Sequence, residues 1–257
     1  MAAVAGGLSA VFLPSHAGAD SDPVCPRSTT TEAIAEPGRL VTKFDLTAFR
    51  DHKSRRVMNA VHKWAGQVRI DLNDTPDRYW AHVEHVVRDL SCLTGLRMYV
   101  RRGGTGFFKG NIQVLTFRRD KLDAFAWRKK IDAELLKDYL CYTVEDLYLD
   151  LSGQYGAVIG LVDDFSEAEK RHCLVKMMAR AFGLFADSDV VQPSIFSPDG
   201  AELDYLPIND KIVLRTLYDP RIEQGMKREE AMEIARQIIP ELVKAVRERG
   251  VEALYQR

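Results

Sequence analysis

Apolar and polar residues alternate in several short stretches of this chain, and such alternation is typical of strands that are buried on one face. Residues 68–72 and 111–117 show the pattern, and residues 96–100 are expected to form a strand between them. Residues 156–162 are almost continuously apolar, which is typical of a strand in the middle of a sheet. The pattern therefore predicts a small sheet that contains these strands.

Helices are expected before and between these strands. A helical spacing of apolar residues covers residues 45–64. A second helix is predicted to begin after Thr75-Pro76, because proline suits a first turn, and to end at Gly95, because glycine readily takes the left-handed conformation after a last turn. Residues 121–148 mix charged and aromatic side chains, and they are expected to be partly helical and partly irregular.

The second half of the chain is organised around one long helix. Ser166 and Glu169 match the capping-box pattern, in which two residues satisfy each other's unpaired amides, so a helix is predicted over residues 167–182. Gly183 is expected to end this helix, and a turn through residues 194–196 follows.

The C-terminal part is predicted to be helical. One helix is expected to end near Tyr218, and a last one is expected to begin near Lys227. Pro240 should kink or split the last helix, because proline has no backbone N–H to donate. With these elements the fold class is α+β, a small twisted mixed sheet with two long helices and a helical C-terminal part.

The N-terminal region differs in composition from the rest of the protein. Residues 1–14 are apolar and uncharged, and Ala17-Gly18-Ala19 fits the cleavage pattern of a secretory signal peptide. A basic segment before the apolar run is missing, so a disordered tail is the alternative. We expect residues 1–19 to be a signal peptide, residues 20–39 a flexible leader, and residues 40–257 a single domain that is periplasmic or secreted.

Composition restricts the partners and the redox chemistry. The net charge of −1 gives no reason to expect nucleic acid, and no apolar run reaches the ~20 residues that span a bilayer. An even number of cysteines suits disulfides in an exported protein, although buried thiols in a cytosolic protein are the alternative. Three pairings are possible for the 4 cysteines, which are Cys25, Cys92, Cys141 and Cys173.

Two stretches invite a ligand-binding interpretation that their context does not support. Residues 103–110 are glycine-rich, but Lys109 is not followed by Ser or Thr and a strand comes next, so they fail as a phosphate loop. His82 and His85 share a helix face on which a metal could bind, but the face is polar and solvated side chains are the simpler interpretation. The sequence offers no serine or cysteine nucleophile with an arguable histidine partner.

The order of elements and the residues of the long helix resemble the zincin fold of metzincin zinc proteases. Those enzymes carry H-E-x-x-H-x-x-G on this helix, with two histidines as zinc ligands and the glutamate as general base. Here Gly183 matches, but Lys176 and Arg180 stand at the histidine positions and Met177 stands at the glutamate position. The third ligand position, near Ala186, has no ligand either. The resemblance therefore implies a zincin-like fold with no metal, no cofactor and no catalytic residue at this helix.

The protein is also similar to an uncharacterised family of exported bacterial proteins, domain of unknown function 2927. The matching residues are Cys173, Gly183, Leu184, Asp187, Ser194, Ile195, Phe196, Asp210, Leu217, Tyr218, Asp219, Pro220, Arg221, Gly225 and Met226. In the family pattern, a cysteine before the central strand accompanies the cysteine that opens the long helix. The resemblance implies a Cys141–Cys173 disulfide, which leaves Cys25 and Cys92 as a possible second pair.

These features lead us to expect a non-catalytic zincin-like domain, a pseudo-protease, that binds a protein or peptide of the cell envelope. A hydrolase or metalloprotease with a non-standard site is the alternative. A purely structural component of an envelope assembly is a third interpretation.

The expected binding surface is the cleft beside the long helix. In zincins an edge strand borders this cleft and pairs with extended peptide, and the strand that contains Asn111 and Gln113 matches it here. Lys176 and Arg180, one helical turn apart, would offer positive charge to a carboxylate of the ligand. Alternatively, both cations point to solvent or pair with a local acid such as Asp187.

Overall fold

The computed structural model describes residues 24–26, 32–51, 56–73, 75–103, 111–121, 141–146, 156–198 and 201–256. The predicted signal peptide, residues 1–19, lies outside the described residues, as do residues 104–110 of the glycine-rich loop and residues 122–140. Within the described part of the protein, no helix is long and apolar enough to cross a membrane.

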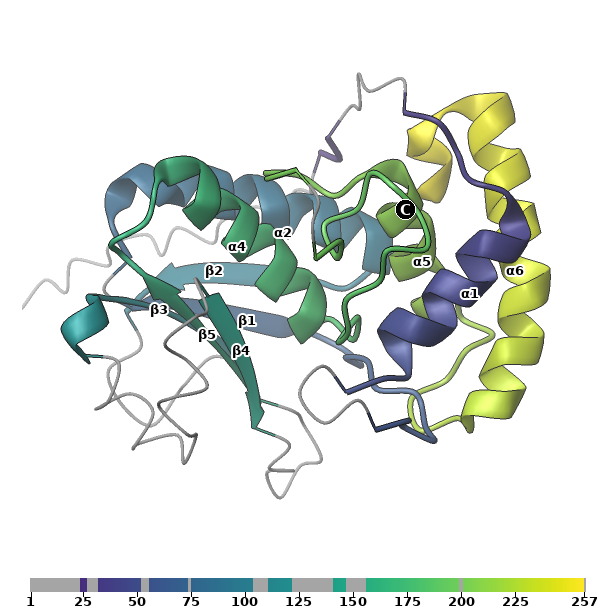
Figure 1. The fold of residues 1–257 in the computed structure, drawn as a ribbon, viewed down its shortest axis with the longest axis horizontal. Coiled ribbons are helices and arrows are strands. Elements are labelled where there is room, and N and C mark those ends of the chain that lie inside the picture. The colour runs from purple at the N-terminus through teal and green to yellow at the C-terminus, as the bar shows by residue number, and fades with distance from the viewer. Residues whose placement is uncertain are drawn as a thin grey trace, which may run out of the picture.

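A five-stranded sheet forms one layer of the domain (Figure 1). Its strands are β1 (Val68–Asn73), β2 (Met98–Arg102), β3 (Ile112–Phe117), β4 (Cys141–Asp146) and β5 (Gly156–Val162). Their spatial order is β2-β1-β3-β5-β4, in which β4 is antiparallel to β5 and every other neighbouring pair is parallel. The predicted strands are confirmed, although the one expected at residues 96–100 begins two residues later.

The prediction that β3 is an edge strand is wrong, because β3 lies between β1 and β5. The edge next to β5 belongs to β4, in a segment whose sequence pattern predicts helix and irregular structure. Residues 141–146 have the sequence Cys-Tyr-Thr-Val-Glu-Asp. Because an outer strand is less buried than a central one, it needs fewer apolar residues, and the apolar pattern of this strand is weak. Asn111, just before β3, and Gln113, within it, are consequently separated from the β4 edge by β5.

Two helices cover the same face of the sheet. α2 (Trp80–Thr94), which follows the short helix η1 (Asp77–Tyr79), lies next to α4 (Glu167–Ala181) above the strands in Figure 1. Alternate side chains of the strands are fully buried on this side, among them Ile70, Ile112, Val114 and Ile159. The main core therefore lies between the sheet and these two helices.

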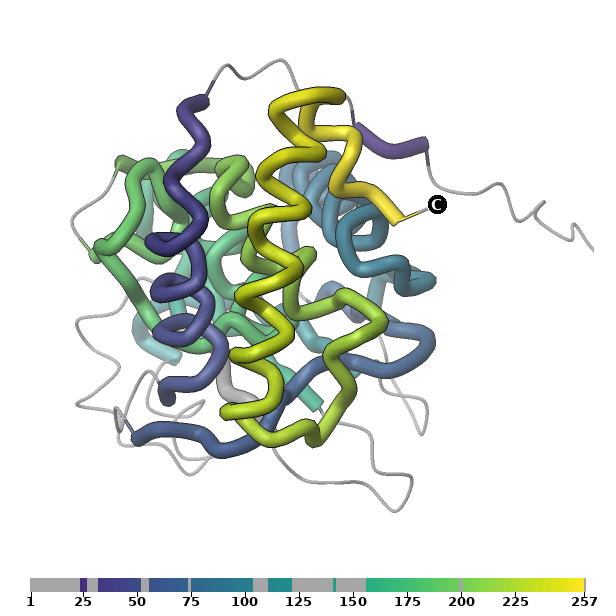
Figure 2. The backbone as a smooth tube through the Cα atoms, turned by 90° about the vertical axis from the view of Figure 1, so that its right-hand side faces the viewer, coloured from purple at the N-terminus to yellow at the C-terminus, as the bar shows by residue number. Residues whose placement is uncertain are grey.

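The remaining helices form a second part beside the sheet. α5 (Ile208–Leu217) contacts α2 on one side and the outer helices α1 (Pro37–Ala48) and α6 (Arg228–Arg249) on the other (Figure 1). The outer helices run next to each other, as Figure 2 shows. Nearly every residue of α5 is buried, so this short helix is the centre of the second part. The described residues also include the short helices η2 (Arg119–Lys121) and η4 (Val251–Leu254).

The first helix begins earlier than predicted. α1 starts at Pro37, which suits a first turn, and its buried apolar side chains recur every four residues as Leu40, Phe44 and Ala48. The described residues of the segment 49–64 contain no helix, so the prediction of a helix over residues 45–64 is wrong. The start of this helix was not predicted because a proline followed by a glycine is typical of a loop. The last residues of the expected leader thus belong to α1.

The predicted ends of the long helices are largely confirmed. Ser166 Oγ accepts from Glu169 N at 3.2 Å, and Glu169 Oε2 accepts from Ser166 N at 2.8 Å. Gly183 has a φ of 102°, and a Cβ at this position would lie 2.4 Å from the carbonyl oxygen of His62, so only glycine fits. α6 runs through Pro240 without splitting, because Pro240 and the residue four positions earlier are exposed and the freed carbonyl can bond to water.

Candidate functional site

Three charged side chains meet beside the C-terminal half of α4, and we call them the α4 ion cluster: Lys176, Arg180 and Asp187. Lys176 and Arg180 lie one turn apart on the same face of the helix. Both bind one oxygen of the carboxylate, with Oδ1 of Asp187 2.9 Å from Lys176 Nζ and 2.7 Å from Arg180 Nη2. The cations therefore pair with a local acid, which is one of the alternatives that the sequence leaves open.

The backbone after α4 carries Asp187 back to the helix. Gly183 turns the backbone, and the amides of Phe185 and Ala186 both donate to the carbonyl oxygen of Thr47 in α1, at 2.7 and 3.2 Å. These two bonds fix the segment immediately before Asp187. The position of the acid thus depends on α1 as well as on α4.

Burial and charge act together on the cluster. The side chains of Lys176 and Arg180 are 13% and 8% exposed, and that of Asp187 is 23% exposed. Burial lowers the pKa of Lys176, while Asp187 opposes this effect and Arg180 adds to it. Burial alone would raise the pKa of Asp187, but Arg180 and Lys176 together hold it below its ordinary value of 3.8. Asp187 is therefore ionised at neutral pH.

The residues that the zincin resemblance would place at ligand positions, Lys176 and Arg180, do not fit a zinc ion. Zinc ligands in proteins are thiolates, imidazoles and carboxylates, whereas a guanidinium and a protonated amine offer no acceptor. Met177, at the position of the general base, is 2% exposed and belongs to the hydrophobic core. In the described parts of the protein, no group of three or more His, Cys, Asp or Glu side chains could hold a metal ion. His82 and His85 accordingly meet no third ligand there.

A second polar cluster lies inside the protein, between α1, α5 and the turn at residues 194–196. Lys43 forms an ion pair with Asp210, and its Nζ donates to Ser194 Oγ at 2.6 Å. Asp210 accepts from Ser194 Oγ at 3.0 Å and from Ile195 N at 2.7 Å. A serine beside a lysine can be a nucleophile, but these side chains are at most 1% exposed and no substrate reaches them. The cluster therefore positions the turn.

The disulfide implied by the family resemblance is present, and so is the possible second pair. Cys141, the first residue of β4, bonds to Cys173 of α4, with Cα atoms 5.7 Å apart. Cys25 bonds to Cys92 in α2, with Cα atoms 5.8 Å apart. The first disulfide ties the first residue of the outer strand to α4, one turn before Lys176.

The segment before α1 is attached to α5 by a contact that the sequence does not predict. Glu32 accepts from the hydroxyl of Tyr205 at 2.8 Å and from the backbone amide of Ile208 at 2.7 Å. Ile208 is the first residue of α5, so the carboxylate caps this buried helix and meets the positive end of its dipole. Burial and Glu32 raise the pKa of Tyr205 to about 12.

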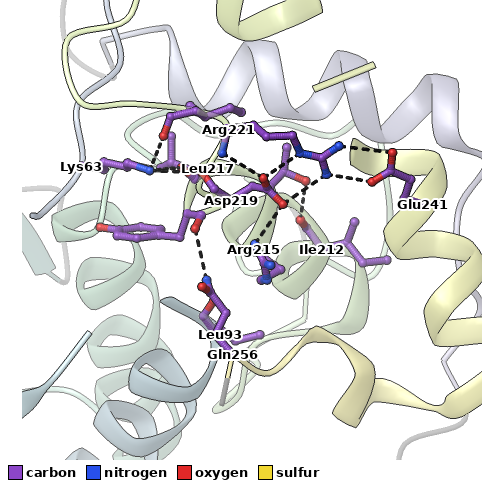
Figure 3. A network of polar contacts seen from close by, with 12 residues as sticks. Lys63, Leu93, Ile212, Arg215, Leu217, Asp219, Arg221, Glu241 and Gln256 are labelled. Atoms are coloured by element: carbon purple, nitrogen blue, oxygen red, sulfur yellow. Dashed lines mark hydrogen bonds and ion pairs between the residues drawn. The ribbon is translucent and has the colours of Figure 1, made fainter. Parts of the chain in front are cut away.

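The residues that follow α5 form a network that fixes its end (Figure 3). Asp219 accepts from the backbone and Nε of Arg221 at 3.1 and 2.9 Å, and Nη2 of Arg221 lies 2.7 Å from Glu241 of α6. Lys63 Nζ donates to the carbonyl oxygen of Leu217 at 3.1 Å, and burial lowers the pKa of Lys63 to about 8. These contacts join the end of α5 to α6 and to the segment before β1.

His172 of α4 is partly buried and takes part in packing. Its Nδ1 accepts from the backbone amide of Leu203 at 3.0 Å. Burial lowers the pKa of His172, and the charge of Lys176 acts in the same direction. The segment between the turn at residues 194–196 and α5 is thus held against α4 by a neutral imidazole.

Comparison with known proteins gives a family without a described activity. A family model described as "Protein of unknown function (DUF2927)" matches residues 38–237. The match runs from α1 into α6, so it includes the sheet and the α4 ion cluster. None of the curated proteins matches this sequence.

Proposed function

The protein belongs to the DUF2927 family of proteins of unknown function, and from its geometry we propose that it is a non-catalytic, zincin-like binding module of the periplasm or cell envelope. The module takes up an extended protein or peptide segment along β4. Its zincin-like architecture and its exported location are parts of this proposal.

The observation that carries the proposal is the α4 ion cluster. Lys176 and Arg180 stand at the histidine positions of the zincin helix, and both bind Asp187. An internal ion pair thus occupies the place of a metal site, and Met177 at the glutamate position is no base. These side chains offer fixed positive charge, which suits binding better than the activation of water.

The sheet supports binding by strand addition. β4 is the outer strand, and no described strand pairs with its other edge. An outer edge presents unpaired amides and carbonyls, to which an extended segment can be added without any catalytic group. The sequential order of outer strand, central strand and long helix also supports the zincin-like interpretation, because β4, β5 and α4 follow in this order.

The two disulfides support the exported location. Disulfides form and persist in oxidising compartments and are rare in the cytosol. Both join segments far apart in the sequence, with separations of 67 and 32 residues.

The proposal is tested by site-specific photo-crosslinking in the cells that encode the protein. One variant has p-benzoylphenylalanine at position 143 in β4, and a matched control has it at position 244 on α6, where the side chain is 77% exposed. We expect position 143 alone to crosslink to a defined extended segment of an envelope component, which mass spectrometry identifies. Strand addition is wrong if position 143 gives no product, or if both positions give the same products.

A further inference from the structure

We propose that the α4 ion cluster is a carboxylate-binding site in which Asp187 is an internal competitor. A carboxylate of the bound segment takes the place of Asp187 between Lys176 and Arg180. The inference rests on the proposed function, because it names the chemistry that the module recognises. The carboxylate comes either from the C-terminus of a polypeptide or from an Asp or Glu side chain of the ligand.

Two cations lie next to the same oxygen atom of Asp187, and the side chain of Asp187 is partly exposed to solvent. Lys176 Nζ and Arg180 Nη2 lie 2.9 and 2.7 Å from the same atom, Oδ1 of Asp187. The side chain of Asp187 is 23% exposed, so this point is accessible from outside. A ligand carboxylate can give one oxygen to each cation, and such charge-assisted pairs are stronger than neutral hydrogen bonds.

Both positive and negative charges surround Lys176. Its ion pairs involve two cations and one carboxylate. The other acid whose charge acts on Lys176 is Asp210 of α5, which is bound to Lys43. His172, one turn before Lys176 on α4, accepts a hydrogen bond through Nδ1 and is neutral in this arrangement. Burial lowers the pKa of Lys176 and the charge of Arg180 adds to this effect, while the charges of Asp187 and Asp210 oppose it.

The cluster follows, along α4, the disulfide that joins this helix to β4. β4 is antiparallel to β5, and α4 turns back along β5, so β4 and α4 run in the same sense (Figure 1). Cys173 joins the start of β4 to α4. At about 1.5 Å per residue, Lys176 and Arg180 lie roughly 4.5 and 10.5 Å further along the helix axis. These distances correspond to about one to three residues of an extended strand.

The test titrates three peptides into the disulfide-bonded protein, residues 20–257, and follows the NMR signals of Lys176 and Arg180. The peptides are acetyl-Ala-Ala with a free C-terminus, the same peptide as its amide, and acetyl-Ala-Glu-amide. We expect the free acid to bind at least tenfold more tightly than the amide. A preference for acetyl-Ala-Glu-amide over acetyl-Ala-Ala-amide would identify a side-chain carboxylate as a further source.

Variants separate a binding site from a structural ion pair. Asp187→Asn removes the competitor and should raise the affinity for the free acid at least fivefold. Lys176→Gln should abolish the preference for acid over amide. The matched control Lys244→Gln, on the exposed face of α6, should change neither value. A structural ion pair would give no gain of affinity in Asp187→Asn.

The comparison of acid and amide on the unmodified protein decides the question even where a variant fails to fold. Equal binding of all three peptides overturns the proposal. So does a preference that appears only in Asp187→Asn, because Asp187 is then a permanent partner of the cations. If the peptides show no preference for a carboxylate but position 143 still gives its crosslink, only the carboxylate site is rejected. An acid preference without that crosslink rejects only strand addition.

Discussion

The guanidinium of Arg180 lies 2.7 Å from Oδ1 of Asp187, across the turn that ends α4. Gly183, between the two residues, has the φ of 102° that lets the backbone reverse there. The ion pair is shared with Lys176, so a single carboxylate binds both cations of the α4 ion cluster. The contact brings two cations and one carboxylate together beside α4.

Replacement of Asp187 by alanine should destabilise the protein. The change leaves two largely buried cations without this carboxylate, and breaking a buried ion pair typically costs about 3 kcal/mol or more. Urea unfolding measures the loss. The matched control is Asp164→Ala, because Asp164 and its partner Arg119 are 42% and 41% exposed. It should cost less than about 1 kcal/mol, and equal losses in the two variants would show that the α4 ion cluster is not a buried interaction.

The buried pair Lys43–Asp210 should behave as one unit. Lys43→Met leaves a fully buried carboxylate without its cation and should cost about 3–5 kcal/mol. Asp210→Asn should be less harmful in the Lys43→Met background than in the unmodified protein, because no charge is then left alone. A double-mutant cycle of unfolding free energies checks this, and strictly additive losses would contradict it.

His172 should make the protein less stable in mild acid. Burial and the neighbouring Lys176 hold its pKa below the ordinary 6.5, while Asp187 on the following segment acts in the opposite direction. Below about pH 6.5 the unfolded state binds more protons than the folded state, because His172 has the higher pKa when the protein is unfolded. The free energy of unfolding therefore falls as the pH drops from about 6.5 toward the lower pKa of His172 in the folded protein.

Replacing His172 by a side chain that accepts a hydrogen bond but does not titrate isolates the effect of protonating His172. His172→Asn keeps an oxygen that can accept from Leu203 and should reduce the loss of unfolding free energy between about pH 7 and pH 5. The control is His85→Asn, because His85 is exposed on α2. If both variants keep the slope of the unmodified protein, His172 does not contribute to the acid sensitivity.

The disulfide between β4 and α4 should contribute to stability as a crosslink. It closes a loop with a separation of 32 residues, for which the chain-entropy model gives about 3–4 kcal/mol. The variant with Cys141→Ser and Cys173→Ser should lose this amount in denaturant unfolding. Peptide mapping without reductant supplies the direct check, and a free thiol at Cys173 would refute the pairing.

The sequence predicts an element well where the order of its apolar and polar residues matches the burial of those residues in the fold. β5 has the predicted bounds, because it is buried on both faces and reads as an apolar run. β4 is a partly polar outer strand, and α1 begins with proline and glycine, so neither has a clear signal. Because the sequence pattern does not predict β4, the expected edge of the sheet fell on the strand that contains Asn111 and Gln113.

The candidate site could be predicted in part. Helical spacing brings Lys176 and Arg180 to one face, and this follows from the sequence alone. Asp187 reaches them through a turn that is fixed on Thr47 of α1, a tertiary contact that no local pattern contains. Lys43 is a similar case, since it meets its partners in α5 and in the turn only in the folded protein. The Cys141–Cys173 disulfide was expected from the family resemblance and not from cysteine spacing, and Cys25–Cys92 was the pair that remained.

The most direct test of a cationic site on α4 is the zinc content of the purified protein, residues 20–257, after exposure to Zn²⁺ and removal of the free ion. Elemental analysis by mass spectrometry gives the molar ratio. The account predicts far less than one zinc per protein molecule, because Lys176 and Arg180 cannot replace histidine ligands. One zinc per molecule that is lost in Lys176→Ala or Arg180→Ala would contradict it.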